Sequence, residues 1–131
     1  MFVDQLREDE KKALMSLLIE ISKADGDLAE QEIEFLSAYS AENKIALNLD
    51  QDVSLPDACS LIKSNKGKIV AIQEIVKLAI VDGYYDEAER KGALAIAEML
   101  GIQLVKFQEI EKWVLDGQQW VAQGLQMIND S

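Results

Sequence analysis

The sequence predicts an all-α fold, in which residues 1–131 form a single-domain helical bundle of six or seven helices. Apolar residues recur at spacings of three and four along nearly the whole chain, which is the period of a helix face. Strand signals are scarce, and proline occurs only once. Apolar residues make up 49% of the chain, which is enough for a core. The length suits one domain.

The first half of the chain predicts three helices. A helix over 8–24 carries an apolar face, and a second helix begins near Ala29. The stretch 43–53 is expected to be a loop, although apolar residues alternate there as in a short strand. Ser54 is a predicted N-cap for a third helix. Cys59 lies on the apolar stripe of that helix, so it is expected to be a small core residue.

The second half predicts two helices and a long C-terminal one. An interruption between helices is expected at 65–67, and it is followed by a helix that runs to about 81. Asp86 and Glu89 have the spacing of a capping box at the start of the fifth helix, and Gly101 closes that helix. Beyond it, about 103–129, the apolar stripe recurs at alternating spacings of three and four, which favours one helix. The stripe consists of Phe107, Ile110, Val114, Gly117, Val121, Gly124 and Ile128.

Charge and composition narrow the classes of function. The formal net charge is −11, which disfavours nucleic acid and anionic membranes as partners. Histidine is absent and Cys59 is the only cysteine, so no pair of nucleophile and base is evident and we expect no enzyme. The N-terminal ten residues turn acidic at once and do not resemble a secretory signal, so a cytoplasmic location is expected.

The chain contains an internal repeat, about 14–40 and 71–101. Residues 18–32 align with residues 75–89 without gaps. Asp25 and Gly26 match Asp82 and Gly83, and glutamate follows at the same distances in both copies. We therefore expect two helical hairpins that turn at Asp-Gly and are related by an approximate two-fold axis.

The repeat residues carry a family resemblance. Ala24-Asp25-Gly26 with Glu32, and Val81-Asp82-Gly83 with Asp86, Glu89 and the later Leu100-Gly101-Ile102, resemble the TerB family, named for tellurite resistance protein B. The resemblance implies an all-helical fold of two related halves, with a cluster of acidic residues that is proposed to bind metal. It links the chain only loosely to tellurite or stress resistance. Ala29 departs from the family pattern, because a capping Ser, Thr or Asp is usual there.

Two hypotheses of function follow, and the first is a module that responds to a divalent cation. Carboxylate oxygens suit Ca²⁺, Mg²⁺ or Mn²⁺. The candidate ligands are Asp25, Asp27, Glu32, Asp82, Asp86 and Glu89. The alternative is that these residues are structural, with aspartates bonded to loop amides and glutamates in the first helical turn accepting backbone N–H groups.

The second hypothesis is a protein-interaction or dimerisation scaffold. Trp113 and Trp120 are seven residues apart and point the same way on the last helix. Gly117 and Gly124 have the same spacing and allow close approach of another helix. The partner is an unidentified protein or a second subunit, and the Asp-Gly loops are then purely structural. The alternative is that the stripe packs as ordinary core.

Overall fold

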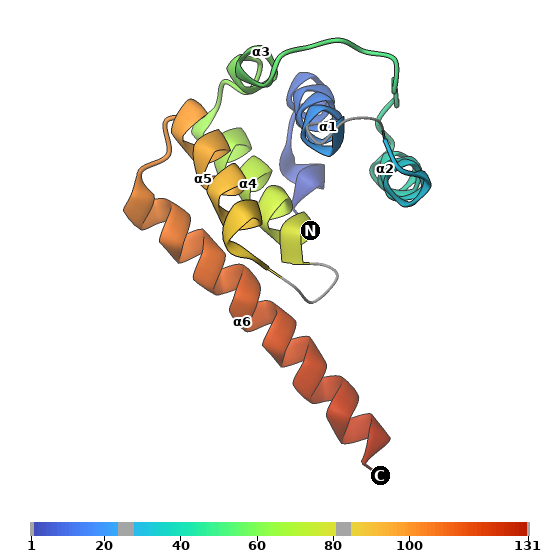
Figure 1. The fold of residues 1–131 in the computed structure, drawn as a ribbon, viewed down its shortest axis with the longest axis vertical. Helices are drawn as coiled ribbons and strands as arrows, with labels where there is room; N and C mark the ends of the chain where they lie inside the picture. The colour runs from blue at the N-terminus through green and yellow to red at the C-terminus, as the bar shows by residue number, and fades with distance from the viewer. Residues whose placement is uncertain (1, 24–27, 81–84, 131) are drawn as a thin grey trace. The chain divides into compact units, whose positions relative to one another are not determined.

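The computed structural model describes residues 2–23, 28–80 and 85–130, and over these ranges the chain forms a short 3₁₀ turn and six α-helices (Figure 1). The elements are η1 (Val3–Gln5), α1 (Glu8–Lys23), α2 (Glu30–Asn43), α3 (Leu55–Ser60), α4 (Asn65–Ile80), α5 (Glu87–Met99) and α6 (Leu104–Asn129). The described residues contain no strand, and the predicted all-α helical bundle is confirmed.

The helices fall into two compact units, residues 1–71 and 72–131, with α4 contributing to both. In the first unit α1 packs against α2 and α3. The predicted apolar face of α1 is its buried face, with Leu14, Leu17 and Leu18 fully enclosed, and α2 contributes Leu36. In the second unit α5 packs against α6. The two-fold relation between the hairpins stays a prediction.

The segment between α2 and α3 is a loop, as predicted. Lys44 ends α2 in the left-handed conformation, with φ of 57°. Ile45 then buries its side chain, so the alternation that resembled a strand follows a helix end instead. Gln51 fastens the loop to α1, because its side-chain amide donates to the Ser16 carbonyl at 3.0 Å and to the Glu20 carboxylate at 2.7 Å.

Two predicted N-caps are confirmed. The Ser54 side chain accepts the Asp57 N–H at 3.2 Å at the start of α3. The Asp86 carboxylate accepts the Glu89 N–H at 2.7 Å at the start of α5. Gly101, with φ of +77°, follows α5 in the left-handed conformation that glycine adopts without strain. These short polar residues set the helix limits because they satisfy N–H groups that the helix itself leaves open.

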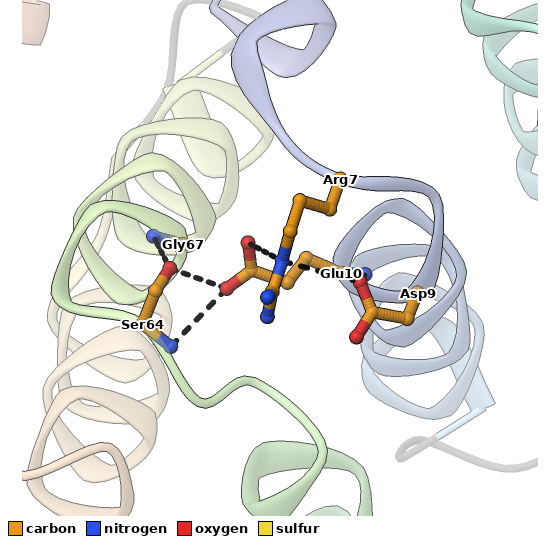
Figure 2. Close-up of polar contacts among 5 residues, drawn as sticks. All are labelled: Arg7, Asp9, Glu10, Ser64 and Gly67. Carbon is orange, nitrogen blue, oxygen red and sulfur yellow. Dashed lines mark hydrogen bonds and ion pairs between the residues drawn. The ribbon is translucent and has the colours of Figure 1, made fainter.

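The predicted break at 65–67 is wrong, because α4 begins at Asn65 and runs through Gly67. Ser64 caps this helix, since its Oγ accepts the Gly67 N–H at 2.9 Å. Gly67 is needed for space (Figure 2). A Cβ at this position would lie 3.1 Å from both Cδ of Glu10 and Cγ2 of Ile62, and closer still to a Glu10 carboxylate oxygen.

Cys59 is buried in α3, as the apolar stripe predicts. Burial raises the pKa of its thiol above the ordinary value, because the thiolate would lose its hydration. The side chain is therefore a small core group in the first unit.

Within the described ranges, none of the helices combines the length and the apolar composition that a membrane span needs.

Candidate functional site

The predicted cation ligands are only partly described. Asp25, Asp27 and Asp82 lie outside the described residues. Glu32, Asp86 and Glu89 are described, and among the described ranges no three acidic or cysteine side chains gather in a way that could hold a metal ion. The cation site therefore stays a prediction.

Two of the described acidic residues have structural roles at helix starts. The Glu32 carboxylate accepts the N–H of Ala29 at 3.0 Å, which offsets the missing side-chain cap at Ala29. Asp86 caps α5 through the Glu89 N–H. Carboxylates at these positions also interact favourably with the positive end of the helix dipole. These contacts match the alternative to cation binding, in which the carboxylates accept backbone N–H groups at helix starts.

A buried carboxylate that the sequence analysis did not single out lies in the first unit. Glu10 is only 3% exposed, and one of its oxygens accepts both the Ser64 hydroxyl and the Ser64 N–H, the latter at 3.2 Å (Figure 2). Its other oxygen lies 3.6 Å from Nε of Arg7. A serine beside a carboxylate resembles part of a nucleophilic site.

The bonding of Ser64 indicates an architectural role for this pair. Its hydroxyl proton goes to Glu10, while the same oxygen accepts the N–H of Gly67. A nucleophile needs a lone pair directed at a substrate, whereas this oxygen is directed at the helix end. The pair therefore links α1 to the start of α4.

The second unit contains the other candidate site, and polar contacts fix the helix that bears it. Glu111 of α6 accepts the Tyr85 hydroxyl at 2.6 Å and the Nε–H of Arg90 at 2.8 Å. Burial, followed by the hydrogen bond to Glu111, raises the pKa of Tyr85 far above its ordinary value, so the phenol stays protonated. The Arg90 guanidinium also lies 5.7 Å from the centre of the Phe107 ring, a cation–π distance.

Apolar burial and one further hydrogen bond complete the attachment of α6. Phe107 is 0% exposed and Ile110 is buried, so the first turns of the predicted stripe are core. Farther along, the Gln118 amide donates to the Ile80 carbonyl at 3.1 Å, satisfying a carbonyl at the end of α4. The contacts of Glu111, Phe107, Ile110 and Gln118 hold the N-terminal part of α6 against its own unit.

The C-terminal part of α6 is exposed along its whole circumference. Every residue from 115 to 130 is exposed. Val114 is half-buried, but the next stripe positions, Gly117, Val121 and Gly124, are open to solvent. Figure 1 shows this part of α6 running on past α5, which belongs to the same unit. The same apolar stripe is therefore core at its beginning and surface at its end.

Large apolar side chains flank this exposed stripe. Trp120 is 75% exposed and Trp113 is 44% exposed, so both predicted partner-binding residues reach solvent. We define the exposed α6 face by six exposed residues that begin at Gly117, beside the last attached residue, Gln118. They are Gly117, Trp120, Val121, Gly124, Leu125 and Met127. Apolar clusters of this kind on a surface mark interaction sites more often than single exposed residues do.

The exposed α6 face is also free of charge. No Asp, Glu, Lys or Arg occurs between residues 117 and 129, in a chain whose net charge is −11. The nearest preceding charge, Asp116, is paired with Lys112 at 2.7 Å. Depletion of charge together with exposed tryptophan is typical of the centre of a protein interface.

Comparison of the chain with family models, with curated proteins and with solved structures finds no match. The TerB resemblance therefore depends on the repeat residues alone and stays a prediction. Sequence reasoning identified both tryptophans but did not name Leu125 and Met127. The signal that could have found them is the long uncharged stretch around them.

Proposed function

We propose that the chain is a non-enzymatic protein-interaction module whose binding surface is the exposed α6 face. The observation that carries this proposal is the continuation of one apolar stripe from the core, at Phe107 and Ile110, into solvent at Val121. Exposed apolar area on one helix stripe is a source of binding energy, since covering it removes that area from water.

The chemistry of the surface favours a protein over other partners. Nucleic acid is bound through Lys and Arg, and helices that lie on membranes carry basic residues on their polar face. The segment 117–129 contains no Lys and no Arg, and the chain as a whole is strongly acidic. Tryptophan, leucine and methionine instead supply the large side chains that fill pockets in protein interfaces.

A photo-crosslinking amino acid placed in the full chain tests this proposal. With the probe at Trp120, we expect a discrete crosslinked protein adduct in cells that express the chain. The matched control is the probe at Gln119, which is also exposed but points away from the stripe. A second substitution, Leu125→Glu, should remove the adduct because it places a charge in the apolar contact.

Two results would contradict the proposal. Equal adducts from positions 119 and 120 would indicate contact without a preferred face. An adduct confined to the chain itself would show that the exposed α6 face is covered intramolecularly.

Substitutions of Asp86 distinguish a helix cap from a cation ligand, because the two roles predict different effects on stability. If Asp86 is only a helix cap, Asp86→Asn should cost no more than the helix-dipole interaction of about 0.3–1 kcal/mol, because asparagine caps as well as aspartate, whereas Asp86→Ala should cost about 0.5–2 kcal/mol. In protein first stripped with a chelator, adding Ca²⁺, Mg²⁺ or Mn²⁺ should leave the Tm unchanged. A rise in Tm that Asp86→Asn abolishes would instead support a cation ligand, since binding to the folded state stabilises it.

A further inference from the structure

We propose that the exposed α6 face binds the same face of a second copy of this chain, with the two helices antiparallel. This inference rests on the proposed function and names its partner. Three properties of residues 117–129 carry it: glycines with open space around them in the described part of the chain, alternation of large and small side chains, and absence of charge.

Among the described residues, nothing contacts the space that a side chain would fill at the two glycines of the face. A Cβ added at Gly117 or Gly124 would meet nothing within 4 Å. Both residues lie in the interior of α6, where glycine is less favourable than alanine. The contrast is Gly67, where a Cβ would collide with Glu10. Glycine on an exposed helix stripe suits the close approach of a second helix.

An antiparallel pair places large side chains opposite small ones. The stripe positions alternate as in a coiled coil, with Val121 and Gly124 at its two kinds of core position. In an antiparallel pair centred between residues 122 and 123, Val121 lies opposite Gly124 of the partner subunit. Trp120 then lies near Met127 of the partner subunit, where sulfur and ring can make a favourable contact.

A parallel pair would pack worse. Each stripe position would face its own equivalent, so Gly117 would meet the partner's Gly117 and Gly124 would meet the partner's Gly124. In that parallel pair Val121 would face Val121 of the partner subunit and hold the helices apart. The layers of two facing glycines would then stay unfilled, and side chains around a void lose dispersion contacts. The spacing of glycine and valine therefore selects the antiparallel arrangement.

Electrostatics select the same arrangement. Each chain has a net charge of −11, but residues 117–129 contribute none of it. Antiparallel pairing also sets the two helix dipoles head to tail. It places the two acidic bodies at opposite ends of a paired segment about 20 Å long. That length is about two and a half times the Debye length at physiological salt, so repulsion between the two acidic bodies is screened.

The mass of the full chain in solution tests the pairing. Over about two orders of magnitude in protein concentration, light scattering should show the mass rising from 14.6 kDa toward twice that value. Val121→Glu should weaken the dimer at least about tenfold, because it places a charge in an apolar contact. Gln119→Glu is the matched control, since it adds the same charge on the opposite side of α6, and it should leave the dimer largely intact.

Spin labels test the orientation. Labels are placed at Lys112 or at Gln126 in a Cys59→Ala background, with one labelled position per chain. In the antiparallel pair the two Lys112 sites are separated along the helix by about 32 Å, and the two Gln126 sites by about 10 Å. A parallel pair would give the same distance at both positions and would overturn the proposed orientation.

The outcomes separate this inference from the proposed function. A monomer at all concentrations that still forms the position-120 adduct with another protein would overturn the second copy as partner and leave the interaction module standing. A monomer whose adduct lies within its own chain would overturn both. A dimer that Val121→Glu and Gln119→Glu weaken equally would overturn the assignment to this face.

Discussion

Gly67→Ala is expected to lower the free energy of unfolding by about 1–3 kcal/mol, although alanine is the better helix former. The added methyl would collide with the Glu10 carboxylate and lie 3.1 Å from the Ile62 side chain. A free carboxylate could move aside cheaply. This one is buried and accepts two hydrogen bonds from Ser64, so moving it breaks the link between α1 and α4.

Gly92→Ala is the matched control for this prediction. Gly92 is also inside a helix, α5, but a Cβ there would meet nothing within 4 Å. That substitution should raise the free energy of unfolding by about 0.5–1 kcal/mol, because alanine loses less backbone entropy on folding. Denaturant unfolding followed by circular dichroism measures both variants. If Gly67→Ala stabilises the protein as well, Glu10 is not fixed where Figure 2 shows it.

A double-mutant cycle assigns the cost to the Glu10 contact. Glu10→Ala alone should destabilise the protein, because the half-buried Ser64 N–H loses its acceptor. In the Glu10→Ala background the methyl of Gly67→Ala has more room, so its additional cost should fall. The two changes are in direct contact and are therefore expected to be strongly non-additive.

The helix limits could be predicted because their causes are local in sequence. Ser54 bonds to the N–H of Asp57, and Asp86 bonds to that of Glu89, three residues on in each case. Gly67 was misinterpreted because the residue that requires a glycine there is distant in sequence. Glu10 precedes it by more than fifty residues, and a glycine that ends a helix looks the same in sequence as one that makes room for a neighbour.

The candidate site was predictable in type but not in extent. Spacings of three and four are identical in the buried and exposed parts of α6, so periodicity alone cannot show where the core ends. Phe107 and Val121 occupy equivalent stripe positions, yet one is enclosed and the other open to solvent. Tertiary packing decides this difference. The loss of charge after Asp116 is the only sign of it in the sequence.

Phe107→Ala is expected to have the largest effect of any single change proposed for α6, about 3–5 kcal/mol of destabilisation. The ring is fully buried in the second unit and also faces the Arg90 guanidinium. Its removal leaves a cavity and takes away the cation–π contact. We expect the loss of stability to appear in unfolding followed by circular dichroism, with unfolding at lower denaturant concentration.

Trp120→Ala is the control for Phe107→Ala. Both changes truncate an aromatic side chain on the same helix, but Trp120 is 75% exposed. In dilute protein its removal should change the free energy of unfolding by no more than about 0.5 kcal/mol. At higher concentration the same change should lower the Tm, because pairing through the exposed α6 face stabilises the folded state and the variant pairs less well. A loss of several kcal/mol in dilute protein would mean that the chain itself buries Trp120, and the exposed α6 face could then not be the binding surface.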